Sequence, residues 1–253
     1  MMGLEQFVDE REPSDRTLVV LDGGGPEIIR QSLGRLFENQ SVRVRDAVPE
    51  TKQEEDTVVL VEDGEVIEST PLEAVYNAVL GVNTDLYTTG SRKLEEAALP
   101  AVLEGLEGVL FELQDYPASE REKLLLVAIS RAIERRAYLG KEGKVRSSFQ
   151  RLSRINDERG TRSVYERLSE EGLDVHLYGQ PDWTPGPEFD VTIHGGYTED
   201  FVSSWFVVYD PPEGVGDPGA LVAFRKDRST WRGFWTFHPA DVTRIARYVE
   251  AEL

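Results

Sequence analysis

Few side chains in this sequence could do specialised chemistry, and histidine is among the scarcest. The chain has three histidines, His176, His194 and His238, and no cysteine. Disulfides, thiolate nucleophiles and cysteine-ligated zinc are therefore excluded, and a metal site would need histidine together with carboxylates. His176 and His194 both lie on predicted strands and could converge. We predict that they line a ligand or form hydrogen bonds in the core, and we predict no metal site.

A glycine-rich turn, residues 23–26, stands between a predicted buried strand and a predicted helix. Such a turn can cradle a phosphate at a helix N-terminus. However, Gly-Gly-Gly-Pro matches neither G-x-G-x-x-G nor G-x-x-x-x-G-K-[ST], and Pro26 lacks an N–H group. We therefore predict a tight structural turn. The motifs H-E-x-x-H and G-x-S-x-G are also absent, and the carboxylates are too numerous to single out a catalytic pair.

Arg131 and Glu134 stand three residues apart in the most hydrophobic predicted helix, so they can pair on one helix surface. Two interpretations remain open. They form either an exposed charged stripe, or a site in which a buried arginine orients an anion or a loop.

A local basic cluster interrupts this otherwise acidic chain. Its members are Arg151, Arg154, Arg159 and Arg162. The cluster could dock a partner protein or contact phosphate. Equally, it could pair along helix surfaces with the nearby carboxylates of Asp157, Glu158 and Glu166.

The stretch Trp-Arg-Gly-Phe-Trp-Thr-Phe, residues 231–237, concentrates aromatic side chains. It superficially resembles an RNA-recognition signature, but Trp235 replaces a required small residue and the acidic charge disfavours RNA. Strand alternation places Trp231 and Trp235 on one face and Phe234 on the other. We predict that the face with Trp231 and Trp235 is core beneath the C-terminal helix, opposite Phe234. Whether Phe234 or the edge of Trp231 reaches a ligand pocket stays open. We predict a ligand pocket between the sheet and the loop 179–187, lined by His176, Trp183, His194 and Trp205. Two further candidate ligand-binding residues are Arg131 and Phe234.

The first half of the chain alternates strands and helices. Strands are predicted at residues 16–22, 42–45, 57–62, 65–67 and 109–113, and Asp63-Gly64 is typical of a hairpin turn. A helix over 93–104 should break or kink at Pro100. The helix over 120–139 carries apolar residues on more than one face, so we expect it to pack on several sides.

The second half begins with further helices, one through Phe149, Leu152 and Ile155, and then becomes strand-rich up to a closing helix from Pro239. The predicted fold class is α/β (α+β): an N-terminal alternating strand–helix segment, a central hydrophobic helix, and a C-terminal mostly antiparallel sheet closed by a terminal helix. We place a boundary between residues 1–115 and 116–253, two segments that could form one compact domain.

The composition is strongly acidic. The 253 residues include 47 Asp and Glu against 28 Lys and Arg, a formal net charge of −19 that is spread along the whole chain. This pattern is typical of proteins adapted to a high-salt cytoplasm, where self-repulsion is screened. It disfavours direct nucleic-acid binding, which needs clustered positive charge. No apolar run approaches the length of a membrane span, so we expect a soluble, cytoplasmic protein that does not bind membranes.

Several short motifs, in order, resemble those of the DICT sensory domain. They are residues 130–134 (Ser-Arg-Ala-Ile-Glu), 149–154 (Phe-Gln-Arg-Leu-Ser-Arg), 175–179 (Val-His-Leu-Tyr-Gly), 204–210 (Ser-Trp-Phe-Val-Val-Tyr-Asp) and 233–237 (Gly-Phe-Trp-Thr-Phe). The acidic, lysine-poor composition is similar to a stand-alone haloarchaeal branch of that family.

The resemblance implies a cytoplasmic, non-catalytic module that binds a small ligand or a partner protein. Such a module would relay its state to a signalling or regulatory protein in trans, and it could form a homodimer. The resemblance implies no ligand set, so the cofactor is unknown. Two alternatives remain: a carboxylate-dependent hydrolase or nucleotide-binding enzyme, and a transcription-linked adaptor that docks through the basic cluster.

Overall fold

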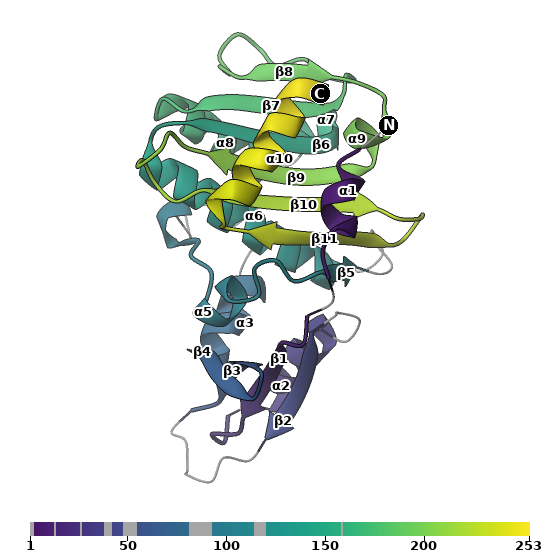
Figure 1. Cartoon of the computed structure of the whole chain (residues 1–253). Helices are drawn as coiled ribbons and strands as arrows, with labels where there is room; N and C mark the ends of the chain where they lie inside the picture. The colour runs from purple at the N-terminus through teal and green to yellow at the C-terminus, as the bar shows by residue number, and fades with distance from the viewer. Residues whose placement is uncertain are drawn as a thin grey trace.

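The computed structural model describes residues 3–12, 14–25, 27–37, 42–47, 55–80, 93–113, 120–157 and 159–253. In this part of the chain the strands form two sheets, one of four strands and one of seven. Figure 1 shows the smaller sheet, in purple and blue, beneath a larger body that carries the seven-stranded sheet and both chain ends. This mixed architecture confirms the predicted fold class.

The four-stranded sheet has the order β2-β1-β3-β4. The elements of this smaller body are β1 (Thr17–Leu21), α2 (Glu27–Phe37), β2 (Arg43–Ala47), β3 (Thr57–Glu62), β4 (Glu65–Pro71) and α3 (Leu72–Leu80). β1 and β2 are parallel, whereas the other two pairs are antiparallel. The predicted hairpin turn is confirmed, because Asp63 and Gly64 have φ of 52° and 84°, the positive values that a two-residue turn favours.

The seven-stranded sheet has the order β5-β11-β10-β9-β6-β7-β8. Its strands are β5 (Phe111–Leu113), β6 (Lys144–Arg151), β7 (Asp174–Gln180), β8 (Thr192–Gly195), β9 (Ser204–Asp210), β10 (Gly219–Arg225) and β11 (Trp231–Thr236). The pairs from β5 to β6 are antiparallel, and β6, β7 and β8 run parallel to one another. The sheet is thus mostly antiparallel, as predicted.

Two helical predictions need correction. Residues 144–151, predicted to belong to a helical stretch, form β6, and only α7 (Ser153–Asp157) beyond them is helical. The reason is non-local, since β6 fills the gap between β7 and β9 and pairs with both. The helix predicted over 93–104 is two short pieces, η1 (Leu94–Glu96) and α5 (Ala101–Glu104). The predicted break at Pro100 is confirmed, because Pro100 has an extended backbone and is the N-cap of α5, but η1 ends earlier, with its C-cap at Ala97, so the helix is shorter than predicted.

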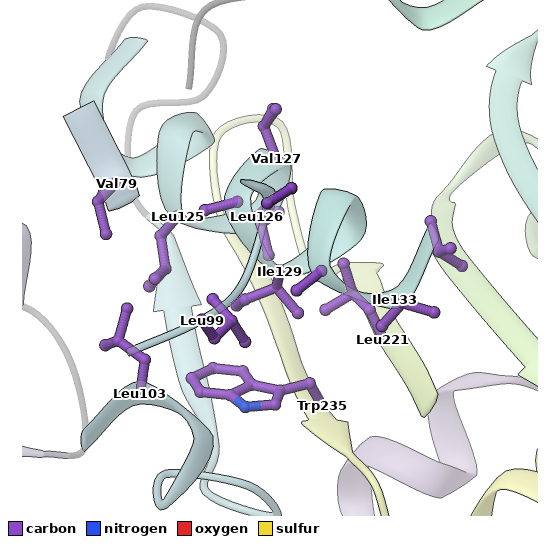
Figure 2. Close-up of a cluster of buried hydrophobic side chains, with 14 of the residues drawn as sticks. Val79, Leu99, Leu103, Leu125, Leu126, Val127, Ile129, Ile133, Leu221 and Trp235 are labelled. Carbon is purple, nitrogen blue, oxygen red and sulfur yellow. The ribbon is translucent and has the colours of Figure 1, made fainter. Parts of the chain in front are cut away.

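The central helix α6 (Glu120–Gly140) lies on one face of the large sheet and also contacts α3 and η1. Figure 2 shows Ile129 and Ile133 of α6 beside Leu221 and Trp235 of the sheet, with Val79 of α3 on another side. All five side chains are buried in one core cluster. Burying each contributes about 1.5–3 kcal/mol, so the predicted many-sided packing is confirmed and α6 joins the two bodies.

The opposite face of the large sheet is covered by α10 (Pro239–Glu252) and α1 (Glu5–Asp9). Val242, Ile245 and Val249 of α10 pack with the fully buried Phe234 of β11. Trp235, next in sequence, packs under α6 instead. Both faces of residues 231–237 are therefore core, but the predicted assignment was reversed, because Phe234 lies beneath the closing helix and the tryptophan face packs in the core beneath α6. Gly233 is required here, because a Cβ would lie 2.5 Å from the Val222 carbonyl oxygen.

Two further helices flank the large sheet, α8 (Arg159–Glu170) and α9 (Glu199–Val202). Within the described residues, no helix is both long and apolar enough to cross a membrane.

Candidate functional site

Two of the predicted ligand residues, His176 on β7 and His194 on β8, meet on the α10 face of the sheet. His176 Nδ1 lies 2.9 Å from His194 Nε2, so one ring donates a proton and the other accepts it. His176 Nε2 lies 3.0 Å from Asp174 Oδ1. The Tyr178 ring stacks on His194, with centroids 4.3 Å apart. Parallel pairing in register places these residues side by side, because His176 opposes Thr192 and Tyr178 opposes His194.

A buried arginine lies beside the histidine pair. Arg146 of β6 is 2% exposed, and its Nη2 forms an ion pair with Glu250 Oε2 of α10 at 3.2 Å. Glu250 also accepts a hydrogen bond from Lys144 Nζ at 3.0 Å. We call these residues, namely Lys144, Arg146, Asp174, His176, Tyr178, His194 and Glu250, the open cluster, because part of it reaches the surface.

The environment of the open cluster shifts several pKa values. Burial lowers the pKa of His194, and the nearby charges of His176 and Arg146 lower it further. The hydrogen bond from Lys144 lowers the pKa of Glu250, and the charge of Arg146 adds to this effect. Burial raises the pKa of Tyr178 to about 12, against the opposing influence of Arg146. At neutral pH the cluster therefore favours a neutral His194 and an ionised Glu250.

The other predicted ligand residues do not join the histidines. Trp183 and Trp205 pack against the core on the α6 side of the sheet, opposite the histidine pair. Phe234 is fully buried beneath α1 and α10, with the Arg11 guanidinium 4.1 Å from its ring centroid. The sequence prediction of the site missed Arg146, Tyr178 and Glu250. Alternate residues of a strand lie on the same face of the sheet. Arg146 could therefore have been assigned to a face of the sheet if residues 144–151 had been recognised as a strand.

Arg131 and Glu134 are both buried, so they do not form an exposed charged stripe. They form a buried ion pair through Arg131 Nη1 and Glu134 Oε2, and Arg131 Nη2 donates to Thr161 Oγ1 of α8 at 2.9 Å. The Tyr165 hydroxyl lies 2.6 Å from Glu134 Oε1 and 2.7 Å from Ser147 Oγ. Because an ionised carboxylate cannot donate, the tyrosine proton goes to Glu134 and Ser147 donates to the tyrosine oxygen.

We call these five residues the sealed cluster. All five are buried, and burial together with the charge of Glu134 raises the pKa of Tyr165 well above its usual value. Arg131 thus orients α8 on the sheet through Thr161.

The basic cluster makes ion pairs within the chain. Arg151 Nε donates to Asp182 at 2.8 Å, and Arg162 pairs with Glu166 at 2.7 Å and with Glu188 at 3.4 Å. Burial alone would raise the pKa of Asp182, but hydrogen bonds from Ser153 and the charge of Arg151 lower it to about 2.

The other two arginines of the basic cluster are Arg154 and Arg159. Arg154 Nη1 donates to the Gln150 side chain. The side chain of Arg159 lies outside the described residues.

The glycine-rich turn holds an internal carboxylate. Asp56 Oδ1 accepts hydrogen bonds from the amides of Gly23 at 2.7 Å and Gly25 at 3.0 Å, and Arg30 pairs with Asp56 Oδ2 at 3.2 Å. Burial would raise the pKa of Asp56, but these amides and Arg30 outweigh it and lower the pKa. The amides that could face a phosphate are therefore occupied, as expected of a structural turn.

A cavity of about 620 Å³ lies between the C-terminal half of α6, α5 and the loop that precedes β10. Its lining includes Leu99, Glu104, Arg135, Arg136, Leu139 and Asp217. Arg136 pairs with Glu104 at 2.9 Å and covers the Phe237 ring at 3.9 Å. A second cavity, of about 730 Å³, lies between α2 and β2 in the smaller body. Among the described residues, no group of three or more His, Asp or Glu side chains could hold a metal ion.

Comparison with known proteins gives one informative match. No curated protein matches the chain. Among solved structures it is similar to a polyphosphate kinase from Porphyromonas gingivalis at 11% identity and a TM-score of 0.35. That likeness covers 98% of this chain and only 44% of the kinase chain, and it is too distant to indicate an activity.

Residues 101–223, from α5 into β10, match the DICT family, described as a sensory domain in diguanylate cyclases and two-component systems. This segment includes α6, the whole sealed cluster, all of the 620 Å³ cavity except Ala98 and Leu99, and the histidine pair. This segment, just under half of the chain, is therefore similar to the DICT family of sensory domains.

Proposed function

We propose that this protein is a cytoplasmic, non-catalytic sensory module that binds a small ligand in the 620 Å³ cavity and relays its occupancy to a separate signalling or regulatory protein. The observation that carries the proposal is the position of this cavity on α6. Its volume falls within the range of small-molecule sites, and nearly all of its lining belongs to the segment that matches a sensory family.

The packing of α6 supports the proposed relay. The helix lines the cavity from Ala132 to Gly140, and nearer its start Leu125 and Leu126 belong to the same core as Val79 of α3. A ligand that favours one position of α6 would therefore bias the contact between the two bodies. The lining combines apolar groups, such as Leu139, with Arg135 and Asp217, which suits a small molecule with both apolar and charged groups.

The test compares a rim substitution with a matched control. Leu139 is 51% exposed at the cavity, so Leu139→Trp should narrow the cavity without disturbing the core. Tyr197→Trp, at a more exposed position after β8 and away from the cavity lining, is the control. Thermal unfolding would be followed with nucleoside phosphates, amino acids and short carboxylic acids, in molar KCl because of the net charge.

A ligand at 100 times its Kd should stabilise the wild type and Tyr197→Trp by about 2.7 kcal/mol, and Leu139→Trp much less. The proposal fails if no compound stabilises the wild type and native mass spectrometry finds no ligand that co-purifies. It also fails if Leu139→Trp responds as the wild type does.

We also propose that the acidic surface is an adaptation to high salt. The net charge of −19 then predicts that the melting temperature rises between 0.15 M and 2 M KCl, as screening relieves repulsion between carboxylates. A melting temperature that is independent of KCl would reject this interpretation.

A further inference from the structure

The open cluster contains a buried cation whose pairing is incomplete. A guanidinium withdrawn from water costs several kcal/mol unless an anion and hydrogen bonds compensate it. Arg146 is 2% exposed, yet within the described residues its Nη1 has no hydrogen-bond partner. Its Nη2 has one ion pair, at 3.2 Å, to a single oxygen of Glu250.

Glu250 is a weakly held partner for that cation. Its side chain is 57% exposed and lies in the last turn of α10. Its other oxygen is held by Lys144, whose side chain is 41% exposed. Helix ends fray, and exposed ion pairs contribute little, so this carboxylate can exchange at low cost.

Both anionic and cationic groups surround Arg146, so its surroundings suit a bound anion only in part. Besides Glu250, the carboxylates of Asp174 and Asp210 face the site, and burial raises the pKa of Asp210. The cationic and donor groups around it are Lys144, Arg247, His176, His194 and the Tyr178 hydroxyl. In a chain with a net charge of −19, such a concentration of donors beside a buried guanidinium needs an explanation.

We infer that Glu250 is an exchangeable internal occupant of an anion site, and that the carboxylate or phosphate group of a small ligand binds there to Arg146 and Lys144 in its place. A free anion can present two oxygens to the guanidinium, which Glu250 does not do. Binding displaces Glu250 and frees the last turn of α10. This site lies on the opposite face of the sheet from the α6 cavity, and the inference stands independently of the ligand proposed there.

The three histidines provide the measurement. Imidazole resonances of the full chain, labelled with ¹⁵N at histidine, would be followed by NMR at pH 7.5 during titration with inorganic phosphate. Parallel titrations use acetate and chloride at equal ionic strength. His176 and His194 report on the site, whereas His238, at the other end of α10, is an internal control.

Variants sharpen the assignment. Glu250→Gln removes the internal competitor and should tighten binding of the anion by about fivefold, and Lys144→Gln should weaken it by a similar factor. Lys226→Gln, a lysine in the turn between β10 and β11, should leave affinity unchanged. Lys144 is used in place of Arg146, since loss of a buried residue could unfold the protein.

Saturable shifts of His176 and His194 with phosphate assign a phosphate ligand, and saturable shifts with acetate assign a carboxylate ligand. Either result supports the inference when Glu250→Gln tightens the affinity. It is overturned if neither anion gives saturable shifts, if His238 shifts in parallel, or if Glu250→Gln has no effect on affinity.

Discussion

The open and sealed clusters lie on opposite faces of one sheet, and they use the same kinds of side chain differently. Each contains an arginine, a glutamate and a tyrosine. Strand β6 contributes one residue to each cluster, Arg146 to the open cluster and Ser147 to the sealed cluster. In the sealed cluster Glu134 is 1% exposed and is held by both Arg131 and Tyr165. In the open cluster Glu250 is 57% exposed. The comparison teaches that burial of the carboxylate, rather than residue type, separates a fixed structural network from an exchangeable one.

The largest expected loss of unfolding free energy is in the sealed cluster. Glu134→Ala leaves the Arg131 charge buried without its ion-pair partner, which should cost about 3–5 kcal/mol of unfolding free energy. Urea unfolding measures this. Glu166→Ala, which breaks the half-exposed pair with Arg162, is the control and should cost roughly 0.3–0.5 kcal/mol. Similar losses for both variants would contradict the distinction drawn between the clusters.

A second comparison removes one hydroxyl from each cluster. Tyr165→Phe removes the buried hydrogen bonds that the tyrosine hydroxyl makes with Glu134 Oε1 and Ser147 Oγ, and it should cost about 1–3 kcal/mol. Tyr178→Phe keeps the stacking on His194 and should cost about 1 kcal/mol or less. Denaturant unfolding measures the loss of unfolding free energy in each variant. A larger loss in Tyr178→Phe than in Tyr165→Phe would contradict the distinction drawn between the clusters.

The clusters should also differ in their response to pH. The pKa of His194 is lowered in the folded protein, so below its ordinary value of 6.5 the unfolded chain takes up a proton more readily. This contribution to stability is full above pH 6.5 and is lost as the pH falls toward the folded-state pKa. The raised pKa of Tyr165 keeps that hydroxyl protonated throughout this range.

Unfolding free energies at pH 7.5 and pH 6 test this prediction. His194→Asn should flatten the pH dependence, and His238→Asn should retain the slope of the wild type. An unchanged slope in His194→Asn would show that another group titrates.

The smallest effect is expected for Glu250→Gln. Because the ion pairs to Lys144 and Arg146 are partly exposed, their loss should cost about 0–1 kcal/mol. Thermal unfolding at low and high salt measures the change. A loss comparable to that in Glu134→Ala would mean that Glu250 is a fixed structural partner, and the contrast between the clusters would fail.

Local pattern predicted much of the fold. The apolar residues on several sides of 120–139 predicted a helix packed on several sides, and Asp63-Gly64 predicted a hairpin that the structure confirms. The prediction was wrong for residues 144–151, where the spacing of Phe149, Leu152 and Ile155 indicated a helix and pairing with β7 and β9 imposed a strand. Because of that error, Arg146 was not predicted as part of the site, since the face on which a strand residue lies is known only once the strand is recognised.

The sequence alone determined the fold class, the absence of cysteine chemistry, the acidic charge and the resemblance of one segment to the DICT family, because each depends on composition, local periodicity or ordered motifs. It also brought His176 and His194 forward as a converging pair. Only the tertiary structure decided which charges are buried. Arg131 and Arg146 are both buried, but long-range packing encloses the carboxylate partner of the first and leaves that of the second exposed in the last turn of a helix. The strength of an ion pair depends on its access to water, which sequence spacing does not specify.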